Sequence, residues 1–309
     1  MKDYFTSPVS NKFIDEGILI TNTSSKDTNL DIFDTDEIIK HFEKYGLIVF
    51  RNFQLTPESV KKFTDLYTTQ YAHDAPRRET KFNSKVIKGV DSGCNEIKLH
   101  SEASFAPVWP EILWFYCKTP PPENMAQTTI LDGTKLWQEF PSKVKSFFMS
   151  SPVMYELIVP VSAQIKNKGK QAWPSKHIGT KDVFVDWDSG EMHFKQMRYA
   201  VHPNRDGKNF SFCNHLLVDF ESEPQMISRE FIFSEKKEDE NEILNEVKNL
   251  SDEHTYFHSW KKNDFIMLDN KRFMHGRASF DSKIERDISQ IQTNIASFPY
   301  GKSTRTLIN

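Results

Sequence analysis

Short apolar segments occur along this sequence, and each is followed by residues that typically end a strand. Ile112–Cys117 is apolar and aromatic, and the proline-rich stretch Thr119–Asn124 follows it. Gln127–Gly133 and Phe265–Leu268 have the same character, and each runs into a turn. The turn Asp269–Arg272 is predicted to join Phe265–Leu268 to Phe273–Arg277 in a hairpin. Segments of this length and composition are typical of buried β-strands. They constrain the chain to a fold rich in sheet.

Helical patterns are fewer and gather mainly near the N-terminus. Asp34–Glu37 opens an amphipathic segment that Gly46 is placed to end, and Thr56–Pro57 starts a second. No internal repeat and no glycine-rich phosphate loop is present. We therefore expect a mainly β fold with flanking helices, a barrel or a double-stranded β-helix (jelly roll). The apolar stripes expected to be buried are Ile38, Ile39, Phe42 and Tyr45; Val60, Phe63, Leu66 and Tyr67; Leu136, Phe140, Val144 and Phe147; and Ile243, Leu244, Val247 and Leu250.

A single domain spanning residues 1–309 is expected, with one segment that stands apart in composition. Residues 164–209 are rich in Lys, Gly, Asn and Asp with isolated aromatic residues. A long segment of weak periodicity inside a domain is often a lid over a site, and a solvated insertion is equally compatible with this composition. Gly17–Ile20, near the N-terminus, is predicted to be an edge strand.

Composition excludes several classes of function. The 40 basic and 43 acidic residues are spread along the chain for a net charge of −3, so no basic stripe for nucleic acid is present. The N-terminus lacks a signal-peptide pattern, and no apolar run approaches the roughly 20 residues of a membrane span. The three cysteines, Cys94, Cys117 and Cys213, are too scattered for a disulfide framework. We expect a soluble cytoplasmic protein.

The segment Leu99–Phe105 holds the first candidate for chemistry. His100 and Glu102 are two residues apart, so on an extended strand both side chains project to one side. His275, within Met274–Arg277, would add a third ligand and complete a set of two imidazoles and one carboxylate. That facial triad holds non-haem Fe(II) and leaves three coordination positions open. A His-x-Glu pair alone is weak evidence, because chance supplies it often.

An arginine follows His275 at a short distance along the chain. Arg286 lies eleven residues further on and begins Arg286–Gln292, in which alternate residues share one face of a strand. An arginine directed into a barrel is costly unless an anion meets it, and a dicarboxylate cosubstrate would be such an anion. The alternative is an outward Arg286 in a surface ion pair.

Other motifs for catalysis are absent or incomplete. His254 and His258 have helical spacing but lack the glutamate of a zinc-protease helix, so they are interpreted as structural. Neither a Gly-x-Ser-x-Gly elbow nor a Gly-Lys-Ser/Thr loop occurs, which removes serine hydrolysis and phosphoryl transfer.

Taken together, these motifs resemble the taurine dioxygenase and clavaminate synthase-like family of Fe(II)- and 2-oxoglutarate-dependent oxygenases. The resemblance runs from about residue 35 to residue 300. It is carried by Gly46–Phe53 with Leu55–Glu58, His100–Glu102 with Ser104–Phe105, Trp109–Pro110 and Leu113–Cys117, Thr128–Gly133, Asp264–Asn270, His275–Arg277, Phe280 and Arg286.

The resemblance implies that His100, Glu102 and His275 bind Fe(II), with 2-oxoglutarate and O2 as cosubstrates. Arg286, together with Thr128 or Thr129, would hold the far carboxylate of 2-oxoglutarate. Met125–Gln127 replaces the two glycines and the acidic residue that precede this threonine in the family, which leaves the choice open, with Thr128 preferred. Because Glu102 supplies a carboxylate, no position is vacated for chloride, and halogenation is disfavoured.

The substrate is not selected by any single residue. Members of the family oxidise sulfonates, aryloxyalkanoates, free amino acids and carrier-protein-bound aminoacyl groups. We expect hydroxylation or desaturation of a small acidic or amino-acid-derived metabolite of secondary metabolism, either free or carrier-protein-bound. A homo-oligomer is left open, and the competing hypothesis is a non-catalytic jelly-roll protein that binds a metal or a small acid. Candidate substrate contacts are Arg198, His202, Asn214 and Arg277.

Overall fold

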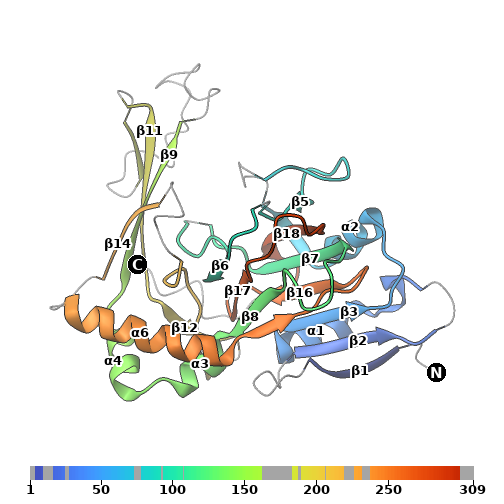
Figure 1. Cartoon of the computed structure of the whole chain (residues 1–309), viewed down its shortest axis with the longest axis horizontal. Coiled ribbons are helices and arrows are strands. Elements are labelled where there is room, and N and C mark those ends of the chain that lie inside the picture. Colours follow the sequence, from blue (N-terminus) through green and yellow to red (C-terminus); the bar gives the residue numbers. More distant parts are fainter. Residues whose placement is uncertain are drawn as a thin grey trace.

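Two facing sheets carry most of the core of the computed structural model (Figure 1). Apolar side chains from both sheets, among them Phe115, Ile130 and Phe273, form one buried cluster between them. The predicted mainly β fold with flanking helices is confirmed.

The eight-stranded sheet has the order β1 (Tyr4–Val9), β2 (Gly17–Asn22), β3 (Leu47–Arg51), β16 (Phe265–Asp269), β7 (Ile112–Thr119), β18 (Asp287–Ala296), β4 (Thr68–Tyr71), with β5 (Lys88–Gly89) pairing with β18. The four-stranded sheet has the order β15 (Tyr256–His258), β8 (Thr128–Asp132), β17 (Phe273–Arg277), β6 (Ile97–His100).

The structure describes most of the chain, in eleven stretches. Much of the predicted lid, including 164–182, lies outside them, so the lid stays a prediction. The described residues are 4–9, 17–24, 28–72, 78–91, 93–106, 108–161, 183–186, 189–205, 207–218, 226–231 and 237–299. In this described part, no helix has both the length and the apolar character needed to cross a membrane.

Two helices cover the outer face of the eight-stranded sheet, α1 (Thr35–Tyr45) and α2 (Pro57–Asp65), as predicted. The Asp34 carboxylate accepts hydrogen bonds from the backbone N–H groups of Asp36 and Glu37 at the start of α1. Gly46 ends the helix with a left-handed φ of 67°. The apolar faces of both helices, with the 3-10 turn η1 (Leu30–Ile32), pack on the sheet around Trp114. Leu66 was expected in that stripe but is 48% exposed, because α2 has already ended at Asp65.

The predicted helix across Leu136–Phe147 is instead two helices. These are α3 (Gly133–Glu139) and α4 (Ser142–Ser150), which the extended residues Phe140 and Pro141 separate. The break lies at Pro141 because proline lacks the N–H that a helix interior needs and restricts the residue before it.

Two strand predictions are also corrected. The strand at Gly17–Asn22 is not an edge strand, because it lies between β1 and β3 and pairs with β3 in parallel. The segments Phe265–Asp269 and Phe273–Arg277 are not a hairpin, because β16 belongs to the larger sheet and β17 to the smaller one. The turn between them therefore carries the chain from one sheet to the other, which a sequence pattern of two strands and a turn does not distinguish from a hairpin.

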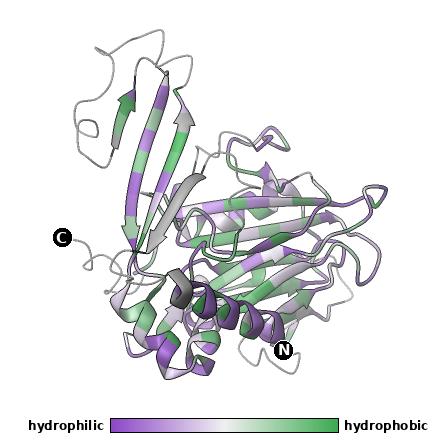
Figure 2. Ribbon diagram, turned by 60° about the vertical axis from the view of Figure 1, so that its left-hand side comes forward, coloured by the Kyte–Doolittle hydropathy of each residue, from purple (hydrophilic) through white to green (hydrophobic). Residues whose placement is uncertain are grey.

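A third sheet projects from the body, with the order β10 (Val183–Asp186), β11 (Glu191–Arg198), β9 (Val153–Pro160), β14 (Met226–Phe231). Hydrophobic and hydrophilic residues alternate along the coloured strands of this sheet in Figure 2. At its base, α6 (Lys237–His254) packs with α3 and α4 in a separate apolar cluster that includes Leu136, Phe148 and Val247. The short pair β12 (Val201–Pro203) and β13 (Phe210–Phe212) adjoins this cluster.

A buried ion pair ties β3 to the turn before β16. The Arg51 guanidinium donates to both oxygens of Asp264, at 2.8 and 2.5 Å, and His258 lies 3.4 Å from the same carboxylate. Burial alone would raise the pKa of Asp264, but Arg51 and His258 outweigh it and hold the pKa below its usual value. His258 therefore has a structural setting, and it lies on β15 rather than on a helix with His254.

Asp264→Asn should lower the free energy of unfolding in urea by about 3–5 kcal/mol at pH 7, because it leaves Arg51 without its partner. A carboxyl whose folded pKa is depressed contributes stability above its unfolded pKa, near 4, and loses that contribution as the pH falls through the folded pKa. The difference between the two proteins should therefore shrink in acid. The exposed pair Lys62–Asp31 is the control, since Lys62→Ala should cost less than about 1 kcal/mol. Equal losses in both variants would contradict this account.

Candidate metal centre

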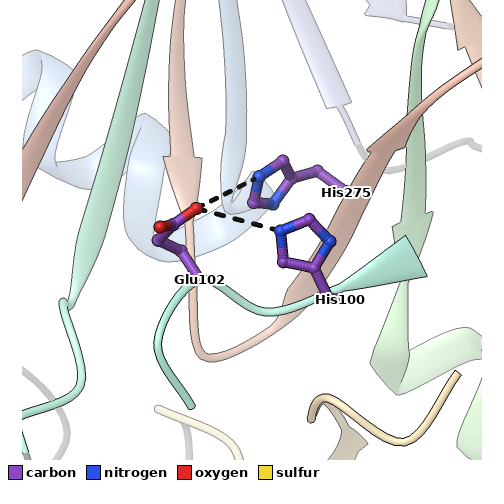
Figure 3. A group of neighbouring side chains, drawn as sticks. All are labelled: His100, Glu102 and His275. Carbon is purple, nitrogen blue, oxygen red and sulfur yellow. Dashed lines mark ion pairs between the residues drawn. The ribbon is translucent and has the colours of Figure 1, made fainter. Parts of the chain in front are cut away.

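His100, Glu102 and His275 converge on one point between the two facing sheets (Figure 3). Their ligand atoms all lie within 4.8 Å of one another. Nε2 of His100 and Nε2 of His275 are each 3.8 Å from Oε2 of Glu102, and the three side chains are 8–13% exposed. Residues 175 positions apart in the chain thus form one compact donor set.

Sheet register places the two histidines side by side. β6 pairs with β17 so that His100 lies opposite His275, with the ring centroids 4.4 Å apart. The Nδ1 of His100 is 2.8 Å from the Lys98 carbonyl oxygen. A proton on Nδ1 donated to that carbonyl leaves Nε2 as the metal-binding nitrogen.

Glu102 is not on the strand that carries His100, contrary to the prediction. β6 ends at His100, and Glu102 lies in the following turn, where Ala103 has a φ of 53°. The turn, rather than strand alternation, aims the carboxylate at the two imidazoles.

Asn270, in the turn that crosses between the sheets, holds the Glu102 turn in place. Its Oδ1 accepts from the Glu102 N–H at 2.9 Å, and its Nδ2 donates to the Glu102 carbonyl at 3.0 Å and the Pro110 carbonyl at 2.8 Å. The Ser101 hydroxyl donates to the Asn270 carbonyl at 2.6 Å. The sequence analysis placed Asn270 in a turn and at the end of the family-like segment Asp264–Asn270, but it assigned no role to this side chain.

The electrostatics of the three side chains suit a divalent metal. Burial would raise the pKa of Glu102, but Arg78 and the two histidines hold it well below its usual range, so the carboxylate is ionised. Burial and the neighbouring His100 lower the pKa of His275 well below its usual value, so its imidazole is neutral. Ionised carboxylate and neutral imidazole are the forms that bind metal, and two imidazoles with one carboxylate suit Fe(II).

Arg78 was missed by the sequence analysis. Its Nη2 lies 3.1 Å from Oε1 and 3.2 Å from Oε2 of Glu102, and Nη1 donates to the Gln290 side-chain oxygen. No local pattern marks this residue, because its contacts are with residues far along the chain.

Arg286 carries a partly buried guanidinium that forms no ion pair with the described residues of the chain. Within the described residues, its Nε and Nη1 atoms are buried without a hydrogen-bond partner, and its charge lies 5.6 Å from the ring centre of Phe280. Burial and the charge of Arg277 lower its pKa to about 10, so it stays charged at neutral pH. A buried cation with unused donors fits the carboxylate of a small ligand.

The pairing of β8 with β17 places the two candidate threonines on opposite faces of the sheet. Thr128 pairs with Arg277 and Ile130 with His275, so Thr128 projects to the same face of the sheet as His275. Thr129 pairs with Gly276 and projects to the opposite face. The Thr128 hydroxyl also accepts from Trp260 Nε1 at 3.0 Å. The geometry favours Thr128 as the residue near a cosubstrate.

The four candidate substrate residues lie in different settings. Asn214 donates to the Ala200 carbonyl and accepts from the Leu216 N–H, and Arg277 donates to the carbonyls of Asp91 and Asn95. Both side chains thus make structural contacts.

Arg198 and His202 lie against Trp109, with the Arg198 charge 5.3 Å from its ring and the His202 ring stacked at 4.9 Å. Trp109 Nε1 donates a hydrogen bond to Oγ of Ser101, the residue before Glu102. Arg198 and His202 are therefore linked to Glu102 through Trp109 and Ser101. They are next to the candidate metal centre rather than part of it.

Comparison with known proteins gives one family. The family model of the taurine catabolism dioxygenase TauD, TfdA family matches residues 23–292. No match was found among curated protein sequences.

Solved structures share the fold at low identity. PvcB from Pseudomonas aeruginosa, described as an Fe, alpha-ketoglutarate dependent oxygenase from an isonitrile synthetic pathway, is 14% identical with a TM-score of 0.63 over 94% of this chain and 92% of that one. AAD-2 in complex with Mn(II) and N-oxalylglycine is 15% identical, with a TM-score of 0.61 over 96% and 98%. A taurine dioxygenase from Burkholderia xenovorans is 12% identical, with a TM-score of 0.62 over 98% and 94%.

Gly276→Ala should displace His100, although Gly276 is not itself a candidate ligand. A Cβ at Gly276 would lie 2.3 Å from the Ile97 carbonyl oxygen and 2.7 Å from Thr129 Oγ1, so β6 must move away from β17 and take His100 with it. We expect the free energy of unfolding to fall by about 1–3 kcal/mol and the affinity for Mn(II) to fall roughly tenfold or more. Gly93→Ala is the control, because its Cβ would meet only the end of the Asp91 side chain within 3.5 Å. Unchanged Mn(II) affinity in Gly276→Ala would contradict the role of this close approach.

Proposed function

This chain belongs to the taurine catabolism dioxygenase TauD, TfdA family, and we propose that it hydroxylates or desaturates an unactivated C–H bond of a small acidic or amino-acid-derived metabolite. Family membership makes it an Fe(II)- and 2-oxoglutarate-dependent dioxygenase. The two facing sheets are inferred to be the two sheets of a double-stranded β-helix.

One observation supports the proposal most strongly, namely that the donor set and Arg286 occur together. A protein that only binds a metal has no need of a partly buried arginine with unused donors as well. A protein that only binds a small acid has no need of two imidazoles and a carboxylate within 4.8 Å. An enzyme that brings a metal and 2-oxoglutarate together needs both.

His100, Glu102 and His275 would hold the iron through three ligands on one side, which leaves the other side for reactants. Bound iron with 2-oxoglutarate supplies the oxidising power: 2-oxoglutarate, O2 and R–H give succinate, CO2 and R–OH, or an alkene and water for a desaturation. Arg286, with Thr128, would orient 2-oxoglutarate through its far carboxylate. The cluster around Phe115 and Ile130 excludes water from the His275 side of the site.

His100→Ala and Glu102→Ala should each reduce succinate release in air to background, in assays with Fe(II), 2-oxoglutarate and a panel of amino acids and small acids. Each change removes one of three ligands, while the sheets that carry them keep their packing. Circular dichroism should show wild-type secondary structure. His41→Ala, on α1 outside the site, should release succinate as the wild type does. Retained turnover in both ligand variants would refute the assignment.

Arg286→Gln should weaken 2-oxoglutarate binding by roughly 10–100-fold, because it removes charge-assisted hydrogen bonds to a carboxylate. Anaerobic titration of the visible band that forms with Fe(II) and 2-oxoglutarate measures the loss, and Mn(II) affinity should be unchanged. Lys283→Gln, which removes an exposed positive charge three residues earlier, is the matched control. Wild-type 2-oxoglutarate affinity in Arg286→Gln would contradict the proposed role.

A further inference from the structure

A small cavity, with room for about one water molecule or the end of a polar group, lies at the edge of the larger sheet, and its lining residue Arg78 contacts Glu102. Two of its lining side chains are cationic, two are amides, and two are small and apolar. No acidic side chain is among the described residues that line it. The lining residues are Ala72, Arg78, Val86, Lys88, Gln290 and Gln292. A lining with this chemistry fits an anion.

Strand register turns this cavity toward the metal centre. On β18, Gln290 pairs with Lys88 of β5 on one side and with Phe115 of β7 on the other, so the three side chains share one face of the sheet. The Phe115 ring lies 5.3 Å from the ring of His275. The amide and the ammonium therefore face the same interior as the metal ligands.

Arg78 links the cavity to the candidate ligands. One side chain contacts both oxygens of Glu102 and the side-chain oxygen of Gln290. Because a guanidinium has five N–H donors, these contacts leave donors for a further partner. An anion held by Arg78 would lie within one side-chain length of the metal.

Gln290 carries an unused donor into the cavity. The residue is 3% exposed, and its Nε2 has no hydrogen-bond partner within the described residues. A buried donor left unpaired is costly, and a carboxylate oxygen of a bound ligand would satisfy it.

This cavity is distinct from the region of Arg286. Arg286 precedes Gln290 by four residues on an extended segment, which is about 13 Å along the strand. One short dicarboxylate whose other end chelates the metal would not serve both regions. The two regions therefore suit two anions, and the cosubstrate accounts for the one at Arg286.

We propose that Arg78, Lys88 and Gln290 bind a carboxylate of the substrate. The proposal rests on the proposed function and narrows its substrate class to free carboxylic acids. An aminoacyl group on a carrier protein has lost its free α-carboxylate to the thioester, so it offers this cavity no charge. A free amino acid or another small carboxylic acid keeps that charge and positions its C–H bonds relative to the metal through it.

The test compares acids with their primary amides. Wild-type protein, loaded anaerobically with Fe(II) and 2-oxoglutarate, is titrated with the proteinogenic amino acids and short straight-chain acids, and each is paired with its amide. The readout is the shift of the visible band on binding. We expect the acids that shift the band to bind at least about tenfold more tightly than their amides, since the amide loses the charge-assisted hydrogen bonds.

Lys88→Gln and Gln290→Leu should each reduce the preference for acid over amide at least about threefold, and together they should abolish it, with 2-oxoglutarate affinity unchanged. Lys85→Gln is the matched control, because it removes the same charge from an exposed position in the same segment. Amides that bind as tightly as acids, no shift with any acid, or a preference that survives in the double variant would each overturn the proposal. A wild-type protein that forms no band with 2-oxoglutarate would instead overturn the proposed function on which it rests.

Discussion

The hydrogen bonds of Asn270 are the interaction on which the site depends. This one amide fixes the backbone of Glu102 on both sides, at 2.9 and 3.0 Å, from the turn where the chain leaves one sheet for the other. The strand that follows this turn carries His275. The crossing between the sheets and the aim of the carboxylate are therefore set by the same residue.

Charge is distributed on two sides of this centre. Arg78 contacts Glu102 and lines the cavity at the sheet edge, whereas Arg286 lies immediately before β18, near Phe280 and Arg277. A divalent metal would take the charge of Glu102 as its ligand, so each arginine is then placed for an anion brought by a small molecule. The arrangement explains why a site with few acidic groups carries two cations with unused donors.

Sequence alone could predict the candidate metal-binding residues but not the residues that hold them in place. The pattern of His100 and Glu102, the distant His275 and the family resemblance were together enough to name the three residues that the structure brings within 4.8 Å of one another. The turn at Glu102 was mistaken for strand, since alternation and a tight turn both bring residues two apart together. Arg78 and Asn270 lie 24 and 168 residues from Glu102, and no local pattern reports such contacts. The helix break at Pro141 was visible in the sequence and was overlooked.

The most direct measurement is a crystal structure of the protein grown anaerobically with Fe(II) and 2-oxoglutarate, with data collected at the iron absorption edge. The account predicts one anomalous peak per chain, within bonding distance of Nε2 of His100, Nε2 of His275 and an oxygen of Glu102. It also predicts a carboxylate of 2-oxoglutarate at Arg286. An iron peak elsewhere, or no peak at saturating Fe(II), would contradict the central claim.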